Sequence, residues 1–222
     1  MKTQNIDRGG QPSPPATLAT ATGKTLVWDL PVRVFHWSLA LAFTIAFVSS
    51  ESERWQLVHI ASGYVTAALI AFRLLWGLIG SRYARFTEFV RGPAAIRAYL
   101  GGMLRLHPPH YTGHNPAGAL AVLALLGLGL LTAGSGWMTF NEVGGEWLED
   151  LREGAAETML ALVFLHIGAV VLSSVLHGEN LIAAMWTGYK KGRPEAGIHR
   201  AHAGVALGVL VLIGGAIYLT LV

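Results

Sequence analysis

Residues 164–178 read FLHIGAVVLSSVLHG, an apolar run that carries two histidines, His166 and His177. A titratable side chain inside a membrane span costs about 3 kcal/mol or more, so it usually faces the bundle interior and serves a site. Eleven positions separate the two histidines, which is about three helical turns and about 16 Å along the axis. Both imidazoles are therefore expected on one face of a helix, at two depths.

The composition is that of an integral membrane protein. The 222 residues are 53% hydrophobic and 13% charged, which is too apolar for an ordinary soluble domain. Five apolar segments approach or exceed the roughly 20 residues that cross a bilayer. They are residues 34–50, 55–80, 117–140, 155–176 and 201–222. Pro31 is well placed to start the first helix a little earlier. We predict an all-α membrane helical bundle, a four-helix core with a fifth C-terminal transmembrane helix.

Three parts are expected along the chain. Residues 1–25 are polar and rich in Pro, Gly, Ser and Thr, which predicts a flexible cytoplasmic tail. Residues 26–192 would form the four-helix domain, and residues 193–222 the additional helix. Cysteine is absent, which excludes disulfides, Cys-ligated clusters and covalent haem attachment through a CxxCH motif.

The charges predict the orientation in the membrane. Thirteen of the sixteen Lys and Arg residues precede the first span or lie in the loops after the second and fourth spans. By the positive-inside rule the N terminus is cytoplasmic and the C terminus periplasmic, so the basic pI reflects topology and does not indicate nucleic acid. Eight of the thirteen acidic residues fall in the opposite loops. They are either a solvated rim or a docking surface for a basic partner.

Two further histidines match the pair on the fourth span. His36 lies near the cytoplasmic start of the first span and His59 near the outer start of the second. With a hairpin near Ser52, His59 is level with about residue 45, and His36 is about 13 Å deeper. Facing pairs at two depths are what two bis-histidine b-type haems require. Four unrelated structural histidines are the alternative.

Small features agree with haem binding. Gly63 lies four residues after His59 and Gly168 two after His166, where a missing side chain would let a flat macrocycle approach. Arg73 is the one arginine inside an apolar span, about 21 Å below His59. It is expected either to pair with a haem propionate or to snorkel to the cytoplasmic surface.

Several motifs in order resemble the prokaryotic cytochrome b561 family, which includes cytochrome b subunits of nickel-iron hydrogenases. They are WDLPVRVFHW (28–37), VHIASGY (58–64), FRLLWGLIGSRYARF (72–86), GHNPAG (113–118) and the paired histidines of the fourth span. The resemblance covers roughly residues 26–192. It implies a four-helix bundle with two b haems that passes electrons between a quinone and a redox partner.

The resemblance also implies residue roles. One haem near the cytoplasm would be shared by His36 and His177, and one near the periplasm by His59 and His166. Arg33, in the first motif, is expected at the cofactor. His114 and Asn115 are expected either to cap the third span or to contact a haem propionate or quinone headgroup. The fifth span and the short outer loops depart from the usual hydrogenase subunit pattern.

Three functions remain open at this point. The first is an electron carrier in the bacterial inner membrane, between quinone and a periplasmic c-type cytochrome or oxidoreductase such as a hydrogenase. The second is a stand-alone superoxide:quinone oxidoreductase, and the third a histidine-lined metal or proton transporter. A homodimer is compatible with each. His107 and His110 are expected at the surface, and His199 and His202 at the membrane interface. Neither these four nor His114 is expected to ligate iron.

Overall fold

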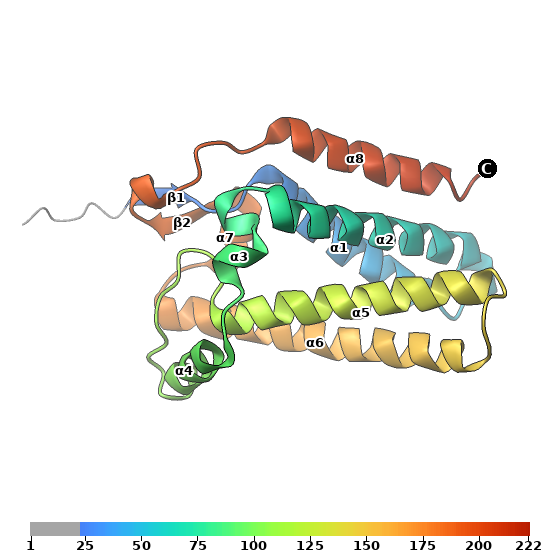
Figure 1. Cartoon of the computed structure of the whole chain (residues 1–222), viewed down its shortest axis with the longest axis horizontal. Helices are drawn as coiled ribbons and strands as arrows, with labels where there is room; N and C mark the ends of the chain where they lie inside the picture. Colours follow the sequence, from blue (N-terminus) through green and yellow to red (C-terminus); the bar gives the residue numbers. More distant parts are fainter. Residues whose placement is uncertain (1–22) are drawn as a thin grey trace, which may run out of the picture.

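The computed structural model describes residues 23–222. Among these, four helices are long and apolar enough to cross a membrane, and they run side by side along the long axis (Figure 1). They are α1 (Leu30–Ser49), α2 (Gln56–Ile79), α5 (Pro116–Phe140) and α6 (Trp147–His177). A shorter apolar helix, α8 (Ala203–Tyr218), packs on α1 and α2. The predicted all-α membrane bundle is confirmed.

Local chemistry fixes where the spans begin and end. Asp29 caps α1, because its Oδ1 accepts a hydrogen bond from the Val32 N–H at 2.9 Å, and Pro31 follows in the first turn. This helix starts before residue 34, as the proline indicated. The helix α6 starts at Trp147, eight positions before the predicted boundary, and ends at Gly178 in the left-handed conformation with φ 58°.

One end of the bundle carries the remaining elements, and we call it the basic end. They are β1 (Gly23–Leu26), α3 (Phe86–Phe89), α4 (Pro93–Leu104), α7 (Leu181–Thr187) and β2 (Tyr189–Gly192). The opposite end, with the α1–α2 and α5–α6 turns, we call the acidic end. Strands β1 and β2 pair antiparallel, with Gly23 opposite Gly192. Residues 23–25 of the predicted tail thus belong to a strand, and residues 1–22 lie outside the described part of the chain.

The spans form a first hairpin, α1–α2, and a second hairpin, α5–α6, and the core lies where α1, α2, α5 and α8 meet. The helix α1 packs on α2, and α6 packs on α5, while α2 also contacts α5. Leu69 and Ile70 of α2 are fully buried at the centre. Large apolar side chains instead point outward on α6, where Phe164 and Leu165 are 65% and 68% exposed. Such a surface suits lipid contact.

Candidate functional site

His36 of α1, His166 of α6 and His114 lie within electrostatic range of one another. The Nδ1 atom of His36 is buried without a hydrogen-bond partner among residues 23–222, and its ring lies 5.0 Å from that of Trp37. Helical side chains lean toward the start of their helix, and α1 and α6 start at opposite ends. The two imidazoles therefore lean in opposite directions along the bundle, His36 toward the start of α1 and His166 toward the start of α6.

His59 lies nearer the acidic end. Its Nδ1 is 2.8 Å from the carbonyl oxygen of Ala46, which matches the depth expected from sequence. This bond leaves Nε2 for another ligand, as in metal-binding histidines whose second nitrogen is held by a carbonyl. Ile70 is eleven residues farther along α2, so it lies about 16 Å closer to the basic end than His59 does.

The contact between α2 and the second hairpin sets the depth of His166. A Cβ placed on Gly129 of α5 would lie 2.6 Å from Ile70 Cδ1 and 3.8 Å from Met159 Cε, so these residues share one level. His166 is seven residues beyond Met159, about 10 Å deeper. His59 and His166 are thus about 27 Å apart along the bundle by helix rise. The depth match expected from sequence is not reproduced, because α6 begins two turns earlier than predicted.

His177 ends α6 at the basic end. Its Nδ1 lies 2.8 Å from the carbonyl oxygen of Ser173, and its Nε2 is buried without a partner in the described chain. The ring centroid is 5.5 Å from that of His110. An imidazole held through one nitrogen, with the other free and buried, has the form of a metal ligand.

Arg73 is inside the bundle. Its side chain is 2% exposed, which does not fit snorkelling to the surface. The guanidinium lies 5.0 Å from the Phe86 ring and 5.9 Å from the Phe89 ring. Nη1 is buried and has no hydrogen-bond partner among the residues described. A buried cation with a free donor favours an anionic group beside it.

His114 occupies an aromatic slot next to Arg73. Its ring centroid is 4.6 Å from Trp28 and 4.5 Å from Phe89, and its Nδ1 is buried and unpartnered within residues 23–222. Burial lowers the pKa of His114 to about 3, and nearby cationic groups add to the shift. These groups belong to Arg73, Lys190, His166 and His36. His114 is therefore neutral and able to donate a hydrogen bond.

Two predicted cofactor contacts have structural duties. Asn115 Oδ1 accepts a hydrogen bond from the Gly118 N–H at 2.7 Å, so the capping role weighed from sequence is the one observed. Arg33 donates from Nη2 to the carbonyl oxygen of Trp186 in α7, while its Nε is buried without a partner in the described part. Cβ atoms placed on Gly63 and Gly168 would meet nothing within 4 Å, so space is open beside both.

Sequence reasoning missed a buried ion pair at the basic end. Lys190 Nζ lies 3.7 Å from Glu179 Oε2 and donates to the Tyr111 carbonyl oxygen at 2.9 Å. Both charged side chains are only 7% exposed. Burial lowers the pKa of Lys190, against the opposing effect of the Glu179 carboxylate. The run of charges around residue 190 indicated only topology, so no sequence signal marked this pair.

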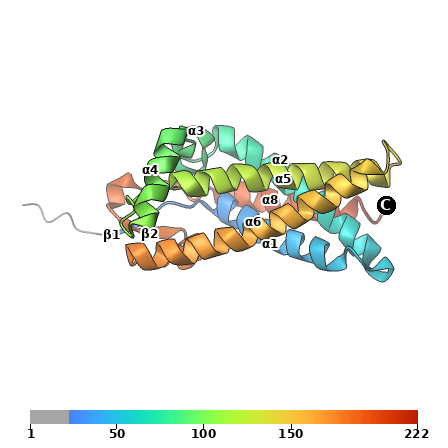
Figure 2. The same ribbon diagram turned by 90° about the horizontal axis from the view of Figure 1, so that it is seen from below.

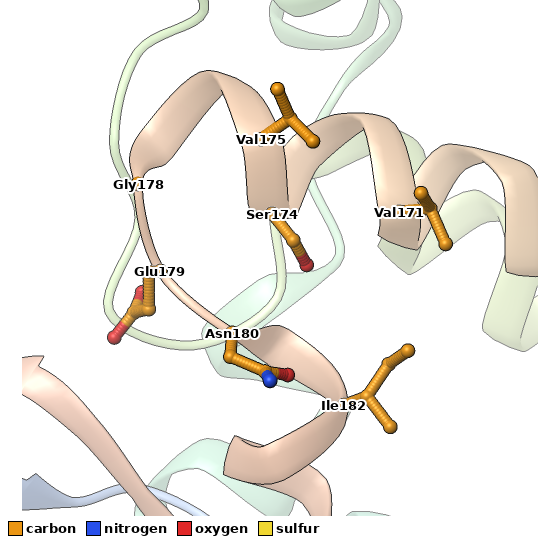
Figure 3. Close-up of a pocket in the computed structure, with 7 residues that line it drawn as sticks. All are labelled: Val171, Ser174, Val175, Gly178, Glu179, Asn180 and Ile182. Carbon is orange, nitrogen blue, oxygen red and sulfur yellow. The ribbon is translucent and has the colours of Figure 1, made fainter.

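A groove lies where α6 turns into α7. It has a volume of about 350 Å³, and Figure 3 shows the side chains around it. Val171, Val175 and Ile182 supply apolar walls, with Ser174 and Asn180 between them. Asn180 Oδ1 already accepts a hydrogen bond from the Ala183 N–H. Its amide nitrogen remains available to a ligand.

Comparison with known proteins decides the family. A sequence model described as prokaryotic cytochrome b561 matches residues 27–188. The chain belongs to the prokaryotic cytochrome b561 family. The family thus covers both hairpins and all four span histidines. No solved structure gives a significant match.

Curated relatives bear related names. A "Probable Ni/Fe-hydrogenase B-type cytochrome subunit" of Rhodobacter capsulatus is 25% identical over 215 residues, covering 74% of this chain and 80% of that protein. Proteins of the same name from Azotobacter vinelandii and Cupriavidus necator are 23% and 22% identical, covering 76% and 78% of this chain and 90% and 91% of theirs. The chain is a multi-pass membrane cytochrome b that takes part in electron transfer.

The residues fit the b-type haem that membership of this family implies. Such a haem is held by axial side chains and needs no cysteine. Buried, unpartnered ring nitrogens at His36 and His177 suit iron ligation. His114, which lies within electrostatic range of His36 and Arg73, offers a buried hydrogen-bond donor, and Arg73 offers another.

Proposed function

We propose that this chain holds a b-type haem between His36 and His166 and passes electrons between membrane quinone and a redox partner protein. The observation that supports this proposal is a buried, unpartnered nitrogen on His36 of α1, within electrostatic range of His166 on α6. Bis-histidine ligation needs one imidazole on each side of the iron. When bound, the haem supplies one-electron oxidation and reduction.

Nearby residues would orient that haem and balance its charge. Arg73 and His114 are neighbours, and each has a free buried donor atom. Both lie toward the basic end, so they favour a haem with its propionates pointing there. Charge-assisted hydrogen bonds from Arg73 would hold one carboxylate, and neutral His114 would donate to a carboxylate oxygen. The aromatic slot around His114 excludes water from these bonds.

Two haems per chain, with all four span histidines as ligands, is the second candidate. The spacing of the histidines in sequence favours it, as do the held and free nitrogens of His59 and His177. The separation of His59 and His166 along the bundle, about 27 Å by helix rise, favours the His36–His166 pair. Haem stoichiometry and ligand variants separate the two candidates.

Quinone and partner are assigned to opposite ends. The groove of Figure 3 opens between apolar side chains and carries the free amide nitrogen of Asn180, which suits a quinone headgroup with its tail in lipid. Exposed carboxylates at the acidic end suit a cationic partner, such as a c-type cytochrome or an oxidoreductase subunit. With the basic end in the cytoplasm of a bacterial inner membrane, the partner is periplasmic. A hydrogenase is one such oxidoreductase, as the names of the relatives suggest.

The test is purification from membranes with all co-migrating proteins, followed by a pyridine haemochrome assay and reduced-minus-oxidised spectra. We expect non-covalent b-type haem and reduction by a quinol analogue. One haem per chain supports the His36–His166 site, and two support the four-ligand arrangement. A chain without a Soret band overturns the proposal and favours a transporter. Quinone reduction by superoxide without any partner favours the stand-alone oxidoreductase.

A further inference from the structure

The helix α4 lies across the basic end, whereas the spans run along the bundle (Figure 2). Its inner face is anchored by Tyr99, which is 1% exposed. Its outer face carries Leu100 and Leu104, which are 47% and 87% exposed and four residues apart. Adjacent turns of one face thus present two large apolar side chains to the surroundings.

The segment around α4 is strongly basic. Residues 82–105 contain five arginines and one acidic residue, Glu88. All five arginines are exposed: Arg82, Arg85, Arg91, Arg97 and Arg105. A positive-inside bias explains their side of the membrane but not their grouping around one crosswise helix that carries exposed leucines. That combination is typical of helices that lie in the headgroup layer.

Leu106, just beyond α4, adds an independent observation. It adopts the left-handed conformation with φ 59°, which costs a non-glycine residue about 1 kcal/mol or more. The turn is fixed by the Leu106 N–H bond to the Met103 carbonyl at 3.0 Å and the His107 N–H bond to the Gly102 carbonyl at 2.9 Å. Its side chain is nevertheless 61% exposed. In water, both the strained backbone and the exposed side chain of Leu106 are unfavourable. Lipid acyl chains would cover the side chain and so remove the second of these costs.

A polar cavity adjoins the start of α4. It has a volume of about 270 Å³, and Arg82, Arg91, His110 and Tyr111 are among the residues that line it. The Arg91 guanidinium lies 5.3 Å from the Tyr111 ring. Glu88 also lines the cavity but is paired with Arg82 at 3.1 Å. Arg91 is thus left to bind a phosphate.

We propose that α4 lies in the headgroup layer of the membrane and binds anionic phospholipid. Arg91, Arg97 and Arg105 bind the phosphates, and Leu100, Leu104 and Leu106 contact the acyl chains. The inference needs only the membrane location of the chain and holds whichever histidines ligate haem. Each arginine near an anionic surface contributes about 1 kcal/mol, or about fivefold in affinity.

The test uses the full chain in detergent, with phosphatidylglycerol binding followed by native mass spectrometry. The triple variant R91Q/R97Q/R105Q should bind phosphatidylglycerol on the order of a hundredfold more weakly, from about 1 kcal/mol for each arginine. The matched control K191Q/R193Q/R200Q removes three exposed charges of the same end outside α4 and should retain binding. Equal losses in both triple variants, or less than a twofold loss in the first, overturn the proposal.

Two further arms separate lipid from other anions and guard against misfolding. Glycerol phosphate, which has the headgroup but no tail, should bind far more weakly than the lipid; equal binding means a free-phosphate site and overturns the proposal. Polyglutamate that binds in preference to the lipid points to an acidic protein and also overturns it. The variant L106G relieves the left-handed strain, so it should raise the melting temperature while weakening lipid binding; unchanged lipid binding contradicts the acyl contact.

Discussion

Trp76 donates its indole N–H to Asp29 Oδ2 at 2.9 Å, while Asp29 Oδ1 caps α1. This fully buried carboxylate therefore fixes the start of α1 against α2, on which the position of His36 depends. Asp29→Ala should destabilise the chain by about 2–4 kcal/mol, from a lost cap and an unpaired buried N–H. Chemical unfolding in detergent measures this, with Trp76→Phe, which keeps the cap, as the milder control. Equal effects of the two variants would contradict the double role.

Ligand variants test which histidines share an iron. We expect His36→Ala and His166→Ala each to remove the same haem signal from reduced-minus-oxidised spectra, because the proposed haem lies between these two side chains. His59→Ala should leave that signal in place. Loss of one common signal in the His59 and His166 variants would instead support the pairing expected from depth in the sequence.

Arg73 should tune the haem potential. Replacing Arg73 with Gln removes a buried positive charge. This loss stabilises the oxidised, more positive iron relative to the reduced iron, so the midpoint potential of the haem should fall. Two unit charges about 10 Å apart at an effective dielectric of 20 interact by about 1.7 kcal/mol, or roughly 70 mV. Redox titration measures the shift. Arg82→Gln, at an exposed side chain, is the control, and a shift no larger than the control's would exclude Arg73 from the site.

His114 should make the chain less stable in acid. Its pKa is about 3 in the folded chain against an ordinary 6.5, so the unfolded chain binds the additional proton between these values. The free energy of unfolding should therefore fall as pH drops from about 6.5 toward 3, by at most about 1.4 kcal/mol per pH unit for one group. The charged and titratable groups facing it are Arg73, Lys190, His36 and His166.

The matched variants for this pH effect are His114→Gln and His107→Gln. The first should flatten the fall in unfolding free energy between pH 4 and 7, measured by chemical unfolding. The second changes an exposed loop histidine and should leave the slope unchanged. Identical slopes in the original chain and the His114 variant would show that this histidine does not carry the effect.

The acidic end should steer the redox partner. Six exposed carboxylates lie between residues 142 and 157, around the first turns of α6. Electron transfer with a cationic partner should slow as salt rises, and neutralising Glu146, Glu149 and Asp150 should slow it about tenfold or more at low salt. Stopped-flow kinetics measures both, with Glu195→Gln, an exposed carboxylate of the basic end, as the control. Rates indifferent to salt and to the triple variant would leave these carboxylates as a solvated rim.

The membrane class, the four long spans and the family motifs could be predicted from the residues alone. Long apolar runs must become helices in lipid because no water satisfies their backbone groups, and Pro31 marked the early start of α1 correctly. The sequence also predicted that His59 lies level with about residue 45, and the observed partner of His59 is Ala46. A short hairpin fixes the register of adjacent helices, so this depth could be predicted. Such features depend on neighbours in the chain.

The relative depth of the span histidines depends on long-range packing. The level of His166 depends on how the second hairpin packs on α2, through a contact between Gly129 and Ile70 that are far apart in the chain. No local pattern encodes that register, and the early start of α6 at Trp147 shifted it from the expected value. The β1–β2 ribbon and the crosswise α4 were missed for the same reason. Each is a short element whose position is fixed by partners distant in sequence.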